Sequence, residues 1–263
     1  MVELTYKEEA AAGYDQVFGW VSRHFIPFLL RAARVAPGQR VFDIATGTGL
    51  AAEAAAALVG QRGHVTAADL SPAMVERARE RLGALPNVTL AIEDGQALSI
   101  PDASFDAVVC SMGLMFFPDP ARGLAEFHRV LRPGGRAAVS VSTVPERSFN
   151  GRINIVIGQH NPAVAEAAAR VFALGDEARL RSLFSQVGFT EVEVTTEAHH
   201  FVLPSFDAYF EPIERGGGSS GQAYIALPED VRRLVREEVR RDLGDTGGPI
   251  KIEVEIRFAS GCR

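Results

Sequence analysis

Two glycines follow an apolar segment near the start of the chain, in VFDIATGTG (41–49). An apolar strand that leads directly into Gly47 and Gly49 and then into a helical pattern is typical of a turn where a ligand approaches the backbone, at the carboxyl edge of a parallel sheet. Gly47 and Gly49, with Ala52 three residues later and Asp69 twenty residues after Gly49, also satisfy the dinucleotide-binding spacing. The turn alone is therefore also compatible with a nicotinamide-dependent oxidoreductase.

Two acidic residues argue against a nicotinamide cofactor. Asp43 lies inside the strand, where a pyrophosphate at the following helix N-terminus would meet a buried like charge. A ligand that carries an ammonium group and no phosphate suits this carboxylate better, and S-adenosylmethionine is such a ligand. Asp94 follows the third expected strand, where it is placed to accept a hydrogen bond from an adenine amine.

The elements that must position these residues are short apolar segments alternating with helical patterns. The expected strands are 40–45, 64–69, 88–93, 105–110 and 136–141, and the expected helices are 50–59, 72–83 and 120–131. Strands that are apolar almost throughout are typical of a sheet covered on both faces, and the β-α repetition predicts a parallel sheet. Asp43, Asp69 and Asp94 would then lie along one edge of that sheet.

The second half of the chain has a different pattern. Helices are expected over 148–174, 176–187, 205–214 and 228–243, and alternating strands over 189–203 and 251–259, the last at or near the sheet edge. The run GGGSSG (216–221) predicts a flexible loop that serves as a lid or surface hinge.

Composition excludes several classes of protein. The 27 Lys and Arg against 33 Asp and Glu give a net charge of −6, which disfavours nucleic acid as a partner. Cys110 and Cys262 are too few for a disulfide framework or a structural zinc site, and we predict no metal. The longest apolar stretches are about half of what a bilayer span requires. The N-terminus lacks the apolar segment of a secretion signal, so we expect a cytoplasmic protein with no integral membrane segment.

Four ordered motifs over about 38–142 resemble the class I S-adenosylmethionine-dependent methyltransferases: VFDIATGTG, ADLSPAMVERAR, EDGQALSIPDASFDAVVCS and EFHRVLRPGGRAAVS. They are most similar to the group that includes the ubiquinone and menaquinone ring C-methyltransferases. The resemblance implies S-adenosyl-L-methionine as cofactor and S-adenosyl-L-homocysteine as product. It also implies an α/β, Rossmann-like, seven-stranded, mostly parallel sheet with an antiparallel final strand and helices on both faces. The chain departs from many members at Ala45, where they have glycine.

The resemblance also implies which residues contact the cofactor. The turn after the first strand would hold the methionine part, with Asp43 orienting either the turn or the ammonium: Asp43, Ala45, Thr46, Gly47, Thr48 and Gly49. The ends of the next two strands would bind the ribose hydroxyls (Asp69), the adenine ring (Leu70, Met74), its amine (Asp94) and its edges (Gly95, Gln96). Ser111 and Met112 would lie beside the methyl group.

Each assignment has a purely structural alternative. Asp43 could be a helix-cap acceptor, Asp69 a turn residue, and Asp94 a residue that only stabilises its loop. The apolar run after the fourth strand is either a wall for the substrate or part of the core: Met112, Met115, Phe116 and Phe117.

The acceptor side is less defined. His199 and His200 are candidate general bases, but alternation along a strand sends them to opposite faces, so at most one faces the site; a surface pair is the alternative. Tyr14, Trp20 and Arg23 in an expected helix over 14–34 are candidate lid residues, with Arg23 pairing with the cofactor's carboxylate. Packing of that helix through its phenylalanines is the alternative.

We therefore predict one methyltransferase domain, 1–263, with a cofactor-binding core over 38–142 and helical cap segments over 1–37, 145–187 and 205–245. The predicted function is methyl transfer by in-line displacement to a small, hydrophobic or aromatic molecule, by a monomer or homodimer. An NAD(P)-dependent oxidoreductase and a catalytically silent cofactor-binding protein are the alternatives.

Overall fold

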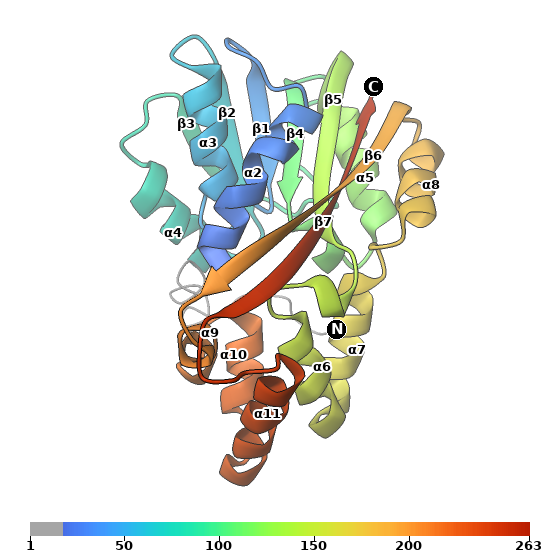
Figure 1. Cartoon of the computed structure of the whole chain (residues 1–263). Coiled ribbons are helices and arrows are strands. Elements are labelled where there is room, and N and C mark those ends of the chain that lie inside the picture. Colours follow the sequence, from blue (N-terminus) through green and yellow to red (C-terminus); the bar gives the residue numbers. More distant parts are fainter. Residues whose placement is uncertain (1–17) are drawn as a thin grey trace.

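The computed structural model describes residues 18–263 and contains one seven-stranded sheet in the order β3-β2-β1-β4-β5-β7-β6 (Figure 1). The strands are β1 (Arg40–Ile44), β2 (His64–Asp69), β3 (Val88–Ile92), β4 (Phe105–Ser111), β5 (Leu131–Ser142), β6 (Thr190–Leu203) and β7 (Ile250–Cys262). The first five are parallel, whereas β7 runs antiparallel to both β5 and β6. This confirms the expected mostly parallel sheet with an antiparallel final strand. β3 and β6 are the two edge strands, and β7 lies next to β6.

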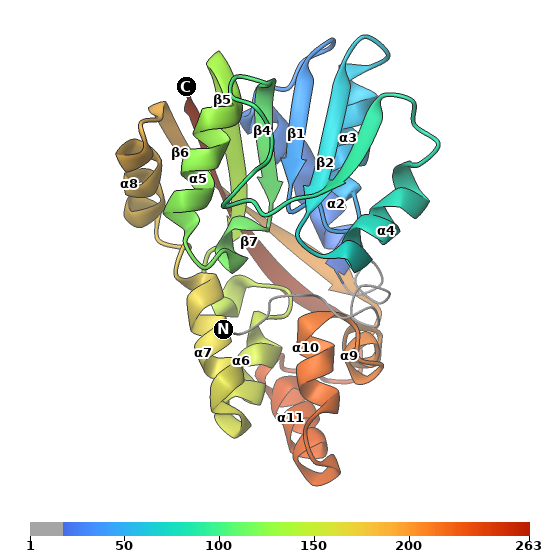
Figure 2. The same ribbon diagram turned by 180° about the vertical axis from the view of Figure 1, so that it is seen from behind.

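Helices cover both faces of the sheet, as expected. α2 (Trp20–Ala32) and α3 (Leu50–Val59) lie over one face, and α5 (Pro120–Val130) and α8 (Glu177–Val187) over the other (Figures 1 and 2). α4 (Pro72–Leu82) packs on β2 and β3. The Ser71 and Asp119 side chains cap α4 and α5, which both begin with proline, and these starts were expected from the sequence.

The expected long helix over 148–174 is wrong, because the chain forms two helices there. α6 (Gly151–His160) ends before Asn161, and α7 (Pro162–Phe172) begins after it. Asn161 has an extended backbone, and its side chain accepts a hydrogen bond from the Ala163 N–H at 3.2 Å. Pro162 offers no N–H to continue α6, so the break follows from local chemistry.

The expected flexible loop over 216–221 is also wrong. α10 (Gly218–Ile225) begins inside the glycine run and lies beside α9 (Phe206–Glu214). Glycine disfavours a helix by about 1 kcal/mol per residue, but tertiary contacts outweigh that preference here. Tyr224 is buried edge-on against Phe210 with ring centroids 5.2 Å apart, and Gln222 Nε2 donates to the Gly216 carbonyl at 2.8 Å.

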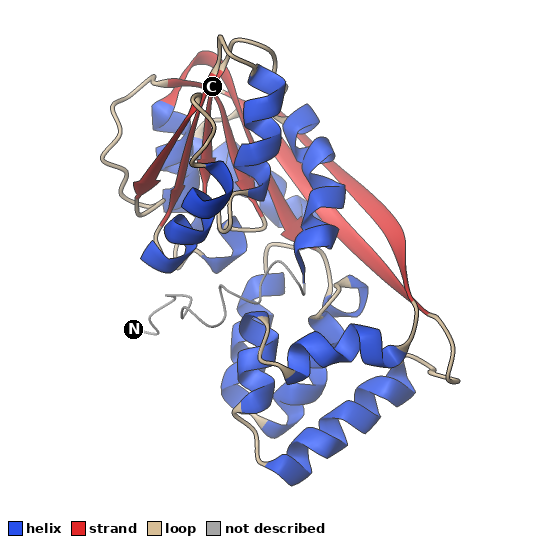
Figure 3. Cartoon of the chain, turned by 90° about the vertical axis from the view of Figure 1, so that its left-hand side faces the viewer, coloured by secondary structure: helices blue, strands red, loops and turns tan. Residues whose placement is uncertain are grey.

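The second group of helices lies beyond the carboxyl ends of the parallel strands (Figures 1 and 3). We call it the cap: η3 (Pro145–Arg147), α6, α7, α9, α10 and α11 (Glu229–Asp242). β6 and β7 continue past the end of β5, from the Ser142–Ile256 pair to the Leu203–Ile250 pair, and this two-stranded extension reaches the cap. Within residues 18–263, no helix has both the length and the apolar character needed to cross a membrane.

Candidate cofactor and acceptor site

The turn after β1 uses its two glycines for different reasons. Gly47 and Gly49 both have positive φ angles, 56° and 84°. Among residues 18–263, a Cβ atom on Gly47 would meet nothing within 4 Å, whereas one on Gly49 would lie 2.8 Å from Leu82 Cδ1 of α4. Gly47 therefore leaves its backbone open with respect to these residues, and Gly49 permits close packing of α3 on α4.

Ala45 also has a positive φ, 56°, at the position where the sequence departs from the family pattern. This backbone region costs a residue with a Cβ about 1–2 kcal/mol. A Cβ on Gly113, just before η2 (Leu114–Phe116), would lie 2.5 Å from the Ala45 Cβ. The Ala45 methyl group thus fits only because Gly113 has no Cβ atom. Sequence reasoning missed this pairing, because the two residues meet only in the folded chain.

Asp43 lies beneath the turn. Its side chain is completely buried, and its Oδ2 accepts a hydrogen bond from Thr46 Oγ1 at 2.6 Å. Its Oδ1 has no hydrogen-bond partner among the residues that the structure describes. Burial raises the pKa of Asp43 to about 7, with the Thr46 hydrogen bond opposing that shift. Asp43 therefore holds the turn from below and places a titratable charge under it.

Asp69 joins the end of β2 to the same turn. Its Oδ2 accepts the Gly47 N–H and its Oδ1 accepts the Ser71 N–H, both at 2.9 Å. Burial raises the pKa of Asp69, while these backbone donors lower it. Each oxygen keeps acceptor capacity, since an ionised carboxylate has about four lone-pair sites. Asp69 has the geometry to fix Gly47 and to accept further donors from a ligand.

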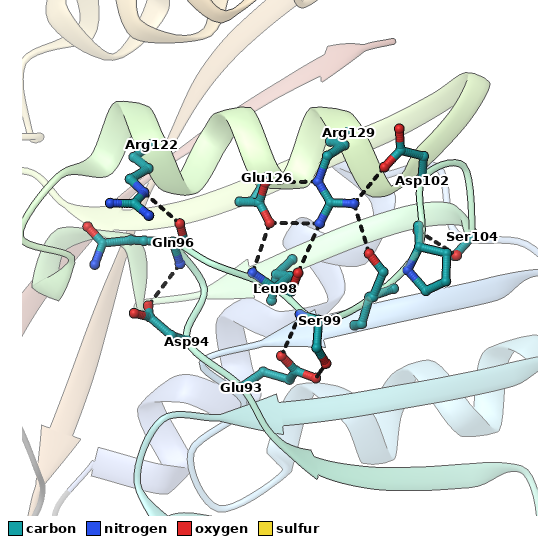
Figure 4. A network of polar contacts seen from close by, with 12 residues as sticks. Glu93, Asp94, Gln96, Leu98, Ser99, Asp102, Ser104, Arg122, Glu126 and Arg129 are labelled. Atoms are coloured by element: carbon teal, nitrogen blue, oxygen red, sulfur yellow. Dashed lines mark hydrogen bonds and ion pairs between the residues drawn. The ribbon is translucent and has the colours of Figure 1, made fainter.

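Asp94 begins a loop that is fastened to α5 (Figure 4). Its Oδ1 accepts the Gln96 N–H at 2.9 Å, which is the local turn expected as the structural alternative. An ionised carboxylate has about four lone-pair sites, so Asp94 keeps acceptor capacity for a ligand. The Gln96 side chain accepts the Asp119 N–H at 2.7 Å, and the Gln96 carbonyl accepts from Arg122 Nε at 2.8 Å. The Gln96 side-chain oxygen is thereby committed to the start of α5.

Glu126 and Arg129 on α5 hold the next part of this loop (Figure 4). Glu126 accepts the Leu98 N–H at 2.8 Å and pairs with Arg129 at 2.7 Å. Arg129 also donates to the carbonyls of Leu98 and Ile100, at 3.2 and 2.8 Å. Glu126 and Arg129 together are called the loop clamp below. The clamp was not predicted, because its partners are about thirty residues apart and no short motif signals it.

The remaining adenine-side residues differ in exposure. Leu70 is 50% exposed, as an apolar contact for a ligand ring requires, whereas Met74 is 3% exposed and packs inside. Gly95 lies against the Phe117 ring, where a Cβ would be 2.5 Å from Cε2. Met112 and Met115 are buried, and Phe116 and Phe117 are half-buried.

The backbone at Met112, which is expected beside the methyl group of the cofactor, is hydrogen-bonded to β5. Ser111 ends β4 and is half-buried, and the Met112 N–H donates to the carbonyl and the hydroxyl of Ser140 at 3.1 and 3.0 Å. Their contact with the cofactor stays a prediction.

Arg23 lies beside the cofactor turn but is paired within the protein. Its Nη1 is 3.0 Å from Glu53 Oε2, in the first turn of α3, and Arg81 bridges Glu53 to the Thr48 carbonyl. Pairing of Arg23 with the cofactor's carboxylate stays a prediction; only Nη1 of its guanidinium is paired with Glu53. Tyr14 lies outside the described residues.

His199 and His200 face opposite sides of β6, as alternation predicts. His199 packs edge-on against α2, with its ring centroid 4.6 Å from His24 and 5.5 Å from Phe25, and its Nε2 lies 3.5 Å from Glu197 Oε2. His200 lies 3.9 Å from Glu253, in a surface hollow lined by α6, α11 and β7. Their catalytic role stays a prediction.

The three predicted carboxylates lie at the carboxyl ends of three neighbouring strands: Asp43 inside β1, Asp69 at the end of β2 and Asp94 just after β3. Asp43 is in register with Ala67 of β2, Asp69 with Ile92 of β3, and the Glu93 N–H donates to the Asp69 carbonyl at 3.2 Å. An open backbone surface at Gly47, bordered by Asp69 and underlain by Asp43, suits a cationic ligand without phosphate.

The sequence matches known families over this same region. A family model for a methyltransferase domain matches residues 41–135. The ubiquinone/menaquinone biosynthesis C-methyltransferase UbiE of Yersinia enterocolitica is 30% identical over 202 residues, which cover 69% of this chain and 80% of that protein. The chain belongs to the UbiE group of class I S-adenosylmethionine-dependent methyltransferases. S-adenosylmethionine is the cofactor of this family, and the NAD(P) alternative is not favoured.

Other relatives match shorter parts of this UbiE-group chain at higher identity. UbiE of Teredinibacter turnerae is 39% identical over 138 residues, 51% of this chain and 55% of that protein. The demethylmenaquinone methyltransferase of Clavibacter sepedonicus is 41% identical over 115 residues, 44% and 46% of the two chains. The chain thus spans about half the length of these relatives.

Solved structures agree on the fold. The YcgJ protein of Bacillus subtilis superposes with a TM-score of 0.62 at 19% identity, covering 91% of this chain and 98% of that one. Phosphoethanolamine N-methyltransferase 2 of Haemonchus contortus, in complex with S-adenosylhomocysteine, gives 0.64 at 19% identity, covering 98% and 58%.

Proposed function

We propose that this UbiE-group chain transfers the methyl group of S-adenosylmethionine to a small, hydrophobic or aromatic molecule. The observation that carries the proposal is the open backbone at Gly47, fixed by the Asp69 carboxylate above the buried Asp43. When bound, the cofactor supplies an electrophilic methyl group on a sulfonium. The residues of the chain need only bind and align the two reactants, since an in-line displacement gains much of its rate from positioning.

In this proposal the individual contacts follow the family pattern. The turn from Ala45 to Gly49 holds the methionine part, Asp69 accepts from the ribose hydroxyls, and Asp94 Oδ2 accepts from the adenine amine. Leu70 covers the ring, while Met74 supports it from inside, which its burial favours. Ser111 and Met112 border the methyl group.

The acceptor lies between the cofactor turn and the cap. α2, α6 and β6 carry buried apolar and aromatic side chains, among them Phe25, Ile153 and Phe201, which supports an acceptor without strong charge. The relatives are named for ring C-methylation in ubiquinone and menaquinone biosynthesis, and this supports a planar ring as the acceptor. We further propose that one domain carries the activity, as a monomer or homodimer in the cytoplasm. Two free cysteines suit a reducing compartment.

Calorimetry tests the cofactor half of the proposal. S-adenosylhomocysteine should bind, while NADH and NADPH at the same concentrations should give no heat of binding. Tight nucleotide binding without thioether binding would overturn the proposal. Transfer of labelled methyl from S-adenosylmethionine to a reduced naphthoquinone would then test the acceptor class, against a charged acceptor such as phosphoethanolamine.

A further inference from the structure

Trp20 is a large aromatic side chain left exposed at the start of α2. The residue is 39% exposed, although its ring lies edge-on to Phe149 at 5.3 Å and to Phe201 at 5.0 Å between centroids. Phe149 lies between η3 and α6, and Phe201 lies near the end of β6; both are buried. Three distant segments therefore support one exposed indole, which we call the Trp20 platform: Trp20, Phe149 and Phe201.

The platform adjoins the cofactor turn. Arg23, three residues after Trp20 and therefore on the same side of α2, pairs with Glu53 in the first turn of α3. Three residues of helix span about 4.5 Å. Trp20 thus lies about one helical turn along α2 from Arg23, whose side chain contacts Glu53 at the start of α3.

The opposite side of the platform adjoins the cap. The Phe149 carbonyl accepts a hydrogen bond at 2.6 Å from the hydroxyl of Tyr209 in α9, and the Phe149 and Tyr209 rings are edge-on at 5.2 Å. The platform therefore stands between the part of the chain that holds the cofactor and the part that covers the acceptor.

A second aromatic cluster, in α9 of the cap, is buried, in contrast to Trp20. Phe206, Tyr209 and Phe210 are all within 2% of full burial, and Arg236 and Arg240 lie over the Phe206 ring. That cluster is completed by its own neighbours. The Trp20 indole instead keeps free aromatic surface at a ligand-binding edge, which suits a further ring.

We propose that the Trp20 platform binds the ring of the methyl acceptor and selects for planar aromatic acceptors. The inference rests on the proposed function, because it needs a cofactor bound at the neighbouring turn. Trp20 acts as a specificity-determining residue that stacks on the acceptor, and Phe149 and Phe201 hold its orientation.

The platform contains the chain's single tryptophan, so fluorescence excited selectively in tryptophan, without exciting the tyrosines, reports on it alone. The probe is 1,4-naphthoquinone, added to protein saturated with S-adenosylhomocysteine, with free N-acetyltryptophanamide as the correction for absorption and collisional quenching. We expect saturable quenching of Trp20. Calorimetry of the same probe should show about tenfold weaker binding to Trp20→Ala and a smaller loss for Trp20→Phe, which keeps a ring. Leu234→Ala, which truncates another exposed apolar side chain on α11, is the matched control and should bind as the wild type does.

The outcomes separate the two proposals. Normal S-adenosylhomocysteine binding in all variants, with unchanged naphthoquinone binding in Trp20→Ala or no saturable quenching in the wild type, would overturn the platform alone. Failure of the wild type to bind S-adenosylhomocysteine would overturn the proposed function and the platform with it.

Discussion

The cofactor edge and the cap hold their functional residues by different forces. At the cofactor edge, carboxylates bind backbone amides at short distances, as Asp69 does with Gly47 and Asp94 with Gln96. In the cap, aromatic rings pack against one another around Phe149 and Tyr209. Hydrogen bonds require particular atoms in particular places, whereas apolar packing tolerates other side chains of similar volume. The cofactor edge is thus suited to one ligand, and the cap can vary with the acceptor.

The family model follows this division. It matches residues 41–135 and so ends before the cap begins. The following experiments test whether the cofactor edge is as tightly determined as this contrast requires.

Gly113→Ala should give the largest loss of stability, about 1–3 kcal/mol in the free energy of unfolding, because the new Cβ overlaps the Ala45 methyl group. Adding Ala45→Gly removes that methyl group and should restore part of the loss; Cys110 Sγ, 2.9 Å from the same Cβ position, limits the recovery. Denaturant unfolding of both single variants and the double variant measures the coupling. Strictly additive effects would show that the two positions do not constrain each other.

Arg129→Ala should release the loop after β3 and lower the free energy of unfolding by about 1–2 kcal/mol, since the carbonyls of Leu98 and Ile100 lose their donor. Affinity for S-adenosylhomocysteine should fall as well, because Asp94 begins this loop. Arg132→Ala, which removes an exposed pair with Asp106, is the control and should cost less than about 1 kcal/mol. Equal losses in the two variants would remove the special role of the loop clamp.

Asp43 should make cofactor binding depend on pH. Burial raises its pKa to about 7, so near neutral pH the carboxyl is partly protonated in the free protein. A cationic ligand favours the carboxylate, so binding should release protons, and affinity for S-adenosylmethionine should rise as the pH increases through about 7. Calorimetry in two buffers of different ionisation enthalpy measures the release. Asp43→Asn should lose this part of the pH dependence; an unchanged profile in that variant would assign it to another group.

Much of the cofactor edge could be predicted from sequence, because each strand and each carboxylate lies in a local pattern. β1 to β4 begin and end within one residue of their expected bounds. The loop clamp and the Ala45–Gly113 contact could not, since they join segments that are far apart in the chain. In the cap, the helix at Gly218 could not be foreseen because burial of Tyr224, not local propensity, stabilises it.

The histidines of β6 should show the smallest effect at the cofactor edge. Both His199→Ala and His200→Ala are expected to leave affinity for S-adenosylmethionine unchanged, since neither contacts the turn in the described structure. Because they face opposite sides, at most one variant should lower kcat, by about 100-fold or more if that residue is the general base. A large loss of cofactor affinity in either variant would contradict this placement.

The most direct test of the account is the affinity for S-adenosylhomocysteine of Asp69→Ala and Asp94→Ala, measured by calorimetry beside the wild type. Each carboxylate is expected to contribute a hydrogen bond to the ligand, so each variant should bind more weakly by about 1–3 kcal/mol. The Asp69 variant should lose more, because that carboxylate also fixes the Gly47 N–H. Wild-type affinity in both variants would show that the cofactor binds elsewhere.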